Sequence, residues 1–246
     1  MRELLKFRFQ PSMDLLVVLV SFLALTIFIY ITWVIVTPAD EITFFILNGL
    51  FLMFSVAVPI AYNSLVKKRP LSETGISKKY WKRSLALGLI VSAIFLGPGP
   101  SAAVVWPTFM ELLPLISFEI ALGLFFAIFF QCWAQMRFEK AFGAIPAILI
   151  ASALFSLHHI GYSGYNEFVP QAVGLFVAGL IPAAIFRITK NILIIWPFFF
   201  PISSLLNELG WGFRLPFEAT YWFAGILSGM LLFIAIVRWK QKIVHI

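Results

Sequence analysis

Charged residues and cysteine are both scarce in this sequence. Only 12% of the 246 residues are charged, and Cys132 is the single cysteine. A soluble domain carries about a quarter charged residues, so the composition excludes an ordinary soluble domain. One cysteine excludes an internal disulfide bond and leaves the redox compartment undetermined.

Apolar residues take the place of the missing charges. They make up 61% of the chain, which includes 28 phenylalanines, and the mean hydropathy is +0.98. Such values are typical of a polytopic membrane protein, and helices satisfy their own backbone hydrogen bonds in lipid. We therefore predict an all-α integral membrane domain over residues 1–246, and we expect the membrane to be a prokaryotic cell membrane.

The apolar runs divide the chain into eight predicted transmembrane helices. They cover residues 15–36, 42–66, 84–106, 115–136, 144–160, 169–186, 191–206 and 220–237. We expect the third span to break at the GPGP run of residues 97–100. Proline should also bend the sixth span at Pro182 and interrupt the seventh at Pro197 and Pro201. Residues 107–114 are expected to form an outer loop, and residues 161–168 a polar turn.

The basic residues fix the orientation of these spans. The net charge of +7 comes from bases that lie between the apolar runs, such as the seven in residues 67–83. Arg137 and Lys140 form a short basic break between the fourth and fifth spans. With a cytoplasmic N-terminus, every base except Arg214 falls in an inner segment. This pattern predicts two cytoplasmic termini beside an anionic lipid leaflet, and it argues against nucleic acid as a partner.

Three stretches of this sequence carry a resemblance to a known family. They read RPLSETGI at residues 69–76, FQCWAQMRFEKAFG at residues 130–143 and PAILIASALFSLHH at residues 146–159. The last stretch places Phe155 and His159 at the spacing of an FxxxH motif. Together, residues 69–207 resemble the core of the CPBP family of intramembrane metalloproteases, which includes CAAX prenyl proteases and bacteriocin-processing or Abi proteins. The resemblance implies that family's helical bundle.

The family's catalytic groups are mostly missing from this chain. The family's EExxxR motif would place its glutamates at Phe126 and Ala127 and its arginine at Gln131, and its later histidine near Pro201. In the family, a glutamate activates water while histidines and a second carboxylate hold a metal or stabilise an oxyanion. Apolar side chains can do neither, and a divalent metal takes three or four protein ligands, so His159 alone is not a site. The resemblance therefore indicates a degenerate member.

Three functions remain open at this point. The first is a non-catalytic pseudoprotease that binds, stabilises or regulates a partner membrane protein and needs no cofactor. The second is a divergent intramembrane metalloprotease in which Glu119, His159 and Glu208 converge in the outer half of the bundle. It would require zinc or another divalent metal, with His158 and His159 as candidate ligands. The third is a small-molecule carrier or channel, indicated by the broken third and seventh helices.

Other polar and small residues are expected to be structural. Gln131 and Gln135 lie one turn apart on one helix face, and Asn207 precedes Glu208. Amide side chains in a bilayer join helices by hydrogen bonds. Small residues in membrane helices predict close contacts of another kind, because they let two helix backbones approach each other. These are Gly174 and Gly179 in the sixth span and the GxxxG pair Gly225 and Gly229 in the eighth.

Overall fold

The structure is a computed structural model. It describes residues 7–36, 41–95, 107–210 and 214–244, with residues 36, 41, 95, 207 and 242–244 in backbone only. Every regular element in these ranges is a helix, which confirms the predicted all-α class. Six helical segments among them are long and apolar enough to cross a membrane, and Ala144–His158 is a shorter apolar helix. The chain is an integral membrane protein.

The described residues form α-helices, π-helical segments and 3₁₀ turns. In chain order they are α1 (Met13–Tyr30), the π-helical segment η1 (Ile31–Val36), α2 (Glu41–Ala61), the π-helical segment η2 (Tyr62–Val66), the 3₁₀ turn η3 (Leu71–Thr74), α3 (Trp81–Phe95), α4 (Phe109–Phe126), the π-helical segment η5 (Ala127–Gln135), α5 (Met136–Phe142), α6 (Ala144–His158), α7 (Ile160–Thr189), the 3₁₀ turn η6 (Ile192–Ile194), α8 (Phe199–Gly210) and α9 (Ala219–Val244).

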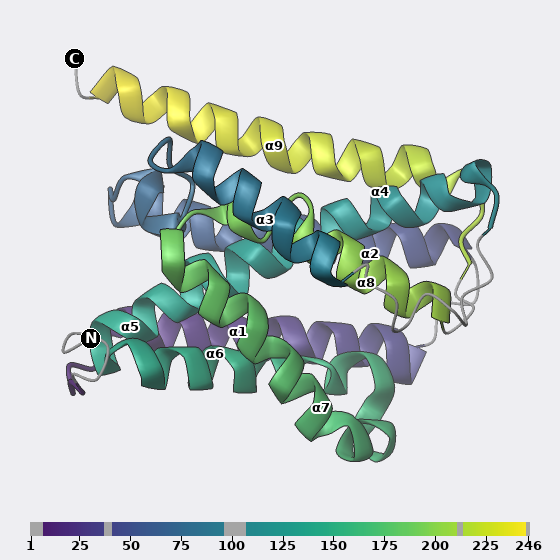
Figure 1. Cartoon of the computed structure of the whole chain (residues 1–246), viewed down its shortest axis with the longest axis horizontal. Helices are drawn as coiled ribbons and strands as arrows, with labels where there is room; N and C mark the ends of the chain where they lie inside the picture. Colours follow the sequence, from purple (N-terminus) through teal and green to yellow (C-terminus); the bar gives the residue numbers. More distant parts are fainter. Residues whose placement is uncertain (1–6, 37–40, 96–106, 211–213, 245–246) are drawn as a thin grey trace.

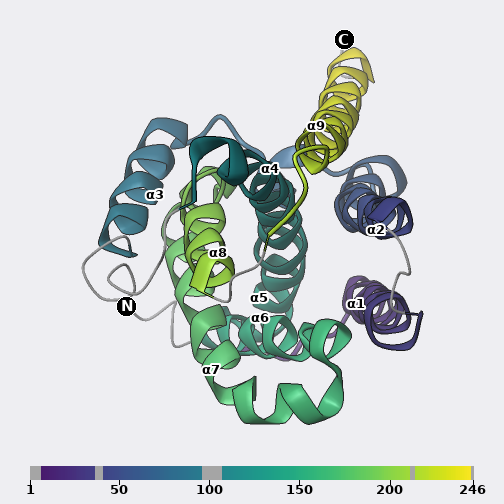
Figure 2. The ribbon, with the colours of Figure 1, turned by 90° about the vertical axis from the view of Figure 1, so that its right-hand side faces the viewer.

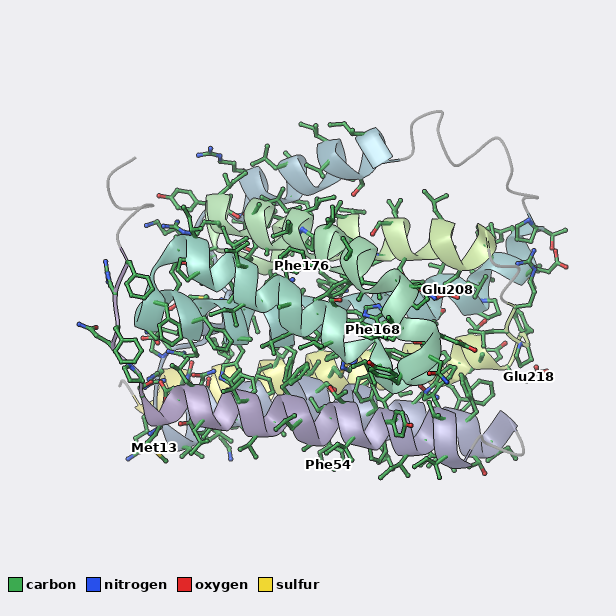
Figure 3. All side chains as sticks on the ribbon, turned by 90° about the horizontal axis from the view of Figure 1, so that it is seen from below. Met13, Phe54, Phe168, Phe176, Glu208 and Glu218 are labelled. Atoms are coloured by element: carbon green, nitrogen blue, oxygen red, sulfur yellow. The ribbon has the colours of Figure 1, made fainter. Side chains whose placement is uncertain are left out.

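The long helices form one bundle with α4 at its centre. Figure 1 shows α1, α2, α4 and α9 running in nearly the same direction while α7 crosses them obliquely, and Figure 2 shows α4 beside α8 with α2 and α9 on its other side. Residues 109–142 form the most buried of the six spans, and α9 forms the least buried. The start of α1 and the end of α9 lie at the same end of the bundle (Figures 1 and 3).

The fourth span begins earlier than the sequence predicted. Residues 107–114 were expected to be a loop, but α4 begins at Phe109 and runs on through η5 and α5 to Phe142. A capping box starts this helix, because the Glu111 carboxylate accepts hydrogen bonds from the Thr108 backbone N–H at 2.7 Å and hydroxyl at 2.7 Å. This arrangement satisfies backbone donors that would otherwise be unpaired at a helix start. The outer-loop prediction is therefore wrong from residue 109 onward.

The polar turn predicted at residues 161–168 is also wrong. These residues belong to α7, whose backbone departs from helical geometry only at Gly164, with φ 70° and ψ 173°. A positive φ suits glycine, so a single residue redirects the helix without a loop. Gly161 just before it faces α1, where an added Cβ would lie 3.0 Å from Ile29 Cβ. The break in this segment lies at Gly164, while Pro182 sits within the helix.

The predicted interruption of the seventh span is confirmed at Pro197. The chain leaves η6 through a turn that contains the cis Trp196–Pro197 peptide, and α8 begins at Phe199. Pro201 does not interrupt the chain, because it lies in the first turn of α8, where proline is tolerated. The predicted break of the third span at residues 97–100 lies outside the described residues. Of this span, the structure describes α3, Trp81–Phe95.

Arg137 does not lie in a break between spans. It is part of the continuous helix that ends at Phe142, and only 2% of its side chain is exposed. Its guanidinium donates to Asn63 Oδ1 at 2.6 Å and to Glu73 Oε2 at 3.2 Å, and it lies 3.9 Å from Asp14 Oδ2. Arg137 therefore joins α5 to α1, to η2 and to the loop before α3. Burial of an arginine requires such partners.

Candidate functional site

The helices α4, α6 and α8, on which the sequence resemblance placed the family's motif positions, meet around Phe126. The Phe126 ring lies on α4 and stacks on Phe200 at the start of α8, with ring centroids 4.6 Å apart and an interplanar angle of 22°. Phe155 near the end of α6 lies 5.4 Å away, and the His159 ring stacks at 6.4 Å. The segments where the sequence placed the family's three motifs thus come together in space.

Two local features fix this meeting point. The helix changes from α-helical to π-helical geometry after Phe126, and all nine residues of η5 are buried. Short π-helical insertions in α-helices occur frequently at functional sites. Just before it, Gly123 allows α8 to approach α4, because a Cβ there would lie 3.0 Å from Pro201 ring atoms.

His159 lies at the C-terminal end of α6 and is bound to its own helix. Its Nδ1 atom forms a hydrogen bond with the Phe155 carbonyl oxygen at 2.8 Å. The Phe155 ring packs edge-on against the imidazole, with ring centroids 4.9 Å apart. One ring nitrogen is therefore engaged with backbone, which leaves Nε2 for any other contact.

His158 points into the core rather than toward the same neighbours as His159. The two imidazole rings are 6.4 Å apart at an interplanar angle of 84°. His158 is 1% exposed, stacks on Phe51 at 5.8 Å, and shares a 3.3 Å hydrogen bond between Nδ1 and Thr26 Oγ1 of α1. Its other neighbours are aromatic rings of α4 and η5. His158 is accordingly a buried bridge between α6 and α1.

Glu119 and Glu208 lie toward the end of the bundle opposite to Met13. Figure 3 shows Glu208 near the end that carries Glu218. Glu119 is fully buried on α4, and Glu208 on α8 is partly buried. Neither carboxyl oxygen of Glu119 has a hydrogen-bond partner among the described residues.

Tyr162 lies beside the two histidines. Its ring lies 5.3 Å from His158 and 6.0 Å from His159, and its buried hydroxyl has no hydrogen-bond partner among the described residues. Sequence reasoning missed Tyr162 because residues 161–168 were interpreted as a turn. The spacing of three residues after His159, which puts the two side chains on neighbouring helical positions, was the available signal.

The residues around Tyr162 do not fit a metal centre. Within the described ranges, no three His, Cys, Asp or Glu side chains gather in a group that could hold a metal ion. Each histidine also has its Nδ1 atom engaged, His158 with a threonine and His159 with a backbone carbonyl. A catalytic zinc requires three protein ligands and an open position. No step of chemistry through a metal is derived from this arrangement.

The predicted structural amides differ in their surroundings. Gln135 donates from Nε2 to the Ala183 carbonyl oxygen of α7 at 2.8 Å, which joins the central helix to α7. Gln131 is 1% exposed, and neither of its polar side-chain atoms has a hydrogen-bond partner in the described part of the chain. The side chain of Asn207 lies outside the described residues. One of the three amides therefore has a visible partner on another helix.

Comparison with known proteins identifies the central part of the chain. Residues 108–204 match the family described as Type II CAAX prenyl endopeptidase Rce1-like. The chain therefore carries an Rce1-like segment. This match confirms the resemblance over those residues, which hold Phe126, Phe155, His159 and Phe200. No curated protein and no solved structure matches the chain.

The Rce1-like segment holds aromatic packing where the family's carboxylates would be. Phe126 is 3% exposed, and its ring centroid lies within 5.6 Å of those of four other phenylalanines, Phe125, Phe130, Phe155 and Phe200. Ala127 is fully buried beside it. Close ring pairs of this kind contribute about 0.5–1.5 kcal/mol each beyond their buried area. The segment is thus a well-packed aromatic core at the positions where the sequence resemblance placed the EExxxR glutamates.

Proposed function

We propose that this chain is a pseudoprotease, a non-catalytic Rce1-like membrane protein that binds and stabilises or regulates another membrane protein. The observation that carries the proposal is the stack of Phe126 on Phe200 in the place of a catalytic carboxylate. Peptide hydrolysis needs a general base within hydrogen-bond reach of water and a donor for the oxyanion. Phe126 and Ala127 supply neither, and the scaffold around them is intact.

The proposal includes a topology and a setting. Residues 69–207 form the family-like core of an eight-helix bundle in a prokaryotic cell membrane, with both termini in the cytoplasm and no bound cofactor. Six helical segments of the described residues are long and apolar enough to span, and the proposal counts α3 and α6, of 15 residues each, as two short spans. An Abi-type role in a protein complex fits the same arrangement.

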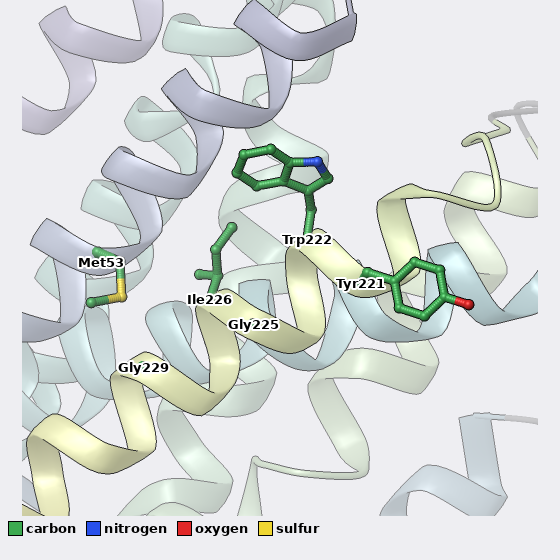
Figure 4. Close-up of a pocket in the computed structure, with 6 residues that line it drawn as sticks. All are labelled: Met53, Tyr221, Trp222, Gly225, Ile226 and Gly229. Carbon is green, nitrogen blue, oxygen red and sulfur yellow. The ribbon is translucent and has the colours of Figure 1, made fainter.

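An apolar groove between α2 and α9 offers a surface for the partner. It is lined by Met53, Tyr221, Trp222, Gly225, Ile226 and Gly229 (Figure 4). A Cβ added at Gly225 would meet nothing within 4 Å, so this glycine faces away from the rest of the chain. Tyr221 is 69% exposed beside it. Glycines at this spacing let a second transmembrane helix approach closely.

Pull-down from native membrane in a mild detergent tests this function. The wild-type chain should bring down a membrane protein in stoichiometric amount, and Gly225→Leu should abolish its recovery by filling the groove. Gly174→Leu is the matched control, because Gly174 also lies on a membrane helix with no atom within 4 Å of an added Cβ. Recovery of the chain alone from native membrane would contradict the proposal.

A divergent hydrolase is the second candidate function. It is favoured by Glu119, whose fully buried carboxyl group has no hydrogen-bond partner among the described residues. An ionisable residue buried within a membrane bundle is costly and tends to be functional. In this case Glu119 or Glu208 would act as base, and His159→Ala would abolish cleavage of the substrate while leaving expression intact. An unchanged cleavage pattern in His159→Ala removes this candidate.

A further inference from the structure

A second groove opens on the lipid-facing side of the bundle, at the end where the bases cluster. It lies between the loop before α3, the η6 turn and the C-terminal part of α9, and its volume is about 560 Å³. Two bases, Lys78 and Arg238, stand at its polar end, and both are exposed. Among the described residues that line it there is no acid.

The walls of this groove are apolar and aromatic. Trp81, Trp196, Leu231 and Ile234 line it. Leu231 precedes Arg238 by seven residues on α9, so the apolar part reaches about 10 Å below the bases at 1.5 Å per residue. Trp81 is 47% exposed and Leu231 is 40% exposed, which places this wall toward the surrounding lipid. Two exposed bases and an apolar wall therefore line the same groove.

Asn191 holds the floor of the groove in place. Its side-chain amide donates to the carbonyl oxygens of Ser77 at 2.9 Å and Lys79 at 2.8 Å. The same side chain accepts a hydrogen bond from the Leu193 backbone N–H at 3.0 Å, and only 1% of Asn191 is exposed. These bonds fix the loop that carries Lys78 against η6. The groove is thus formed before any ligand arrives, which reduces the entropy cost of binding.

We propose that this groove binds one anionic phospholipid from the leaflet at the basic end of the bundle. The phosphate lies between Lys78 and Arg238, and one acyl chain lies along Leu231 and Ile234. Neither base forms an ion pair with an acid in the described part of the chain, so both charges are available to the phosphate. Basic pockets beside membrane helices are the sites where anionic headgroups bind.

Native mass spectrometry of the purified full chain in detergent tests the proposal, with phosphatidylglycerol and phosphatidylcholine as separate probes. The wild-type chain should retain one phosphatidylglycerol molecule in strong preference to phosphatidylcholine. Lys78→Gln/Arg238→Gln should bind phosphatidylglycerol about thirtyfold more weakly, because each base near a bilayer contributes about 1 kcal/mol and every 1.4 kcal/mol is tenfold.

Two further variants separate the groove from general surface charge. Lys68→Gln/Lys240→Gln removes the same charge from exposed bases that do not line the groove, and it should leave lipid retention unchanged. Leu231→Trp keeps both bases but fills the apolar wall, and it should weaken retention. Equal retention of the two lipids by the wild type, equal losses in the two double variants, or displacement by soluble glycerol 3-phosphate would overturn the proposal.

Discussion

Arg137 is the charged side chain most deeply buried at the basic end of the bundle. It is held by Asn63 and Glu73, with Asp14 at 3.9 Å. Removing one partner of a buried charged network leaves the others without compensation, which costs about 3–5 kcal/mol. We expect Arg137→Ala to lower the free energy of unfolding by about this amount, measured by thermal unfolding in detergent.

Lys140 provides the matched control for this prediction. It lies in the same helix and binds the same carboxylate, with Nζ 2.7 Å from Glu73 Oε2, but 57% of its side chain is exposed. An exposed ion pair contributes about 0–1 kcal/mol. Lys140→Ala should therefore lower the unfolding temperature much less than Arg137→Ala. Equal losses in the two variants would show that Arg137 is not a structural anchor.

Glu73 makes the stability of the same cluster depend on pH. Burial raises the pKa of this carboxyl group, but the hydrogen bonds and charges of Lys140 and Arg137 outweigh burial and hold the pKa below its usual value. A lowered folded-state pKa stabilises the protein above the unfolded-state pKa of about 4.3, and this contribution is lost as pH falls through the folded value. We expect Glu73→Gln to lower the unfolding temperature at pH 7.

The pH profile of the two proteins distinguishes this effect from simple loss of a contact. The difference in unfolding temperature between wild type and Glu73→Gln should stay constant from pH 7 to about pH 5. It should then shrink as pH falls from about 4.3, where the carboxyl group of the unfolded chain becomes protonated, through the lower pKa of the folded state. A difference that remained constant across the whole range would contradict the ionised state of Glu73.

The sequence identified His159 as a candidate site residue, but it did not predict which residues surround His159 in the fold. The FxxxH spacing and the absence of glutamate at positions 126 and 127 can be read directly from the sequence, and the Rce1-like match covers those positions. The burial of Arg137 was not predictable, because its partners Asp14 and Asn63 lie 123 and 74 residues away in sequence. A base between two apolar runs is normally an inner-loop residue, and only tertiary contact reverses that interpretation.

Gly179 controls the contact between α6 and α7, which share the most extensive helix interface of the described bundle. A Cβ added there would lie 2.9 Å from Phe155 Cδ1 and 3.1 Å from Ser152 Cα. Overpacking a tight contact costs about 1–3 kcal/mol. We expect Gly179→Leu to destabilise the chain by at least this amount in thermal unfolding. Gly174→Leu, one and a half turns earlier in open space, should leave the unfolding temperature unchanged.

The positions of most helices were predictable from the sequence, and several boundaries were not. Residues 42–66 and 144–160 were predicted within two residues of the helical segments that the structure shows. The start of α4 was not predicted, because Pro107 and Pro114 indicate a loop. The Thr108–Glu111 capping box nevertheless starts a helix between them. The run after His159 was missed because polar residues and glycines indicate a turn, whereas only Gly164 leaves helical geometry.

The N-terminal and C-terminal helices of the described chain place their outer ends on the same side of the bundle. Met13 and the last turn of α9 lie at the same end of the bundle (Figures 1 and 3). Bases concentrate at that end, as in the loop that carries Lys67 and Arg69. Cytoplasmic segments carry the excess of Lys and Arg. Reporters fused to either terminus should both be active in the cytoplasm, and a periplasmic signal from one of them would contradict the topology.

We propose that this chain keeps an Rce1-like segment at residues 108–204 in which aromatic packing around Phe126 takes the place of a catalytic site. The most direct test of this proposal is mass spectrometry of the peptides released from membrane proteins, comparing membranes that contain the wild-type chain, contain His159→Ala or lack the chain. A pseudoprotease predicts the same set of released peptides from all three. Peptides that appear with the wild-type chain and disappear with His159→Ala would contradict the account.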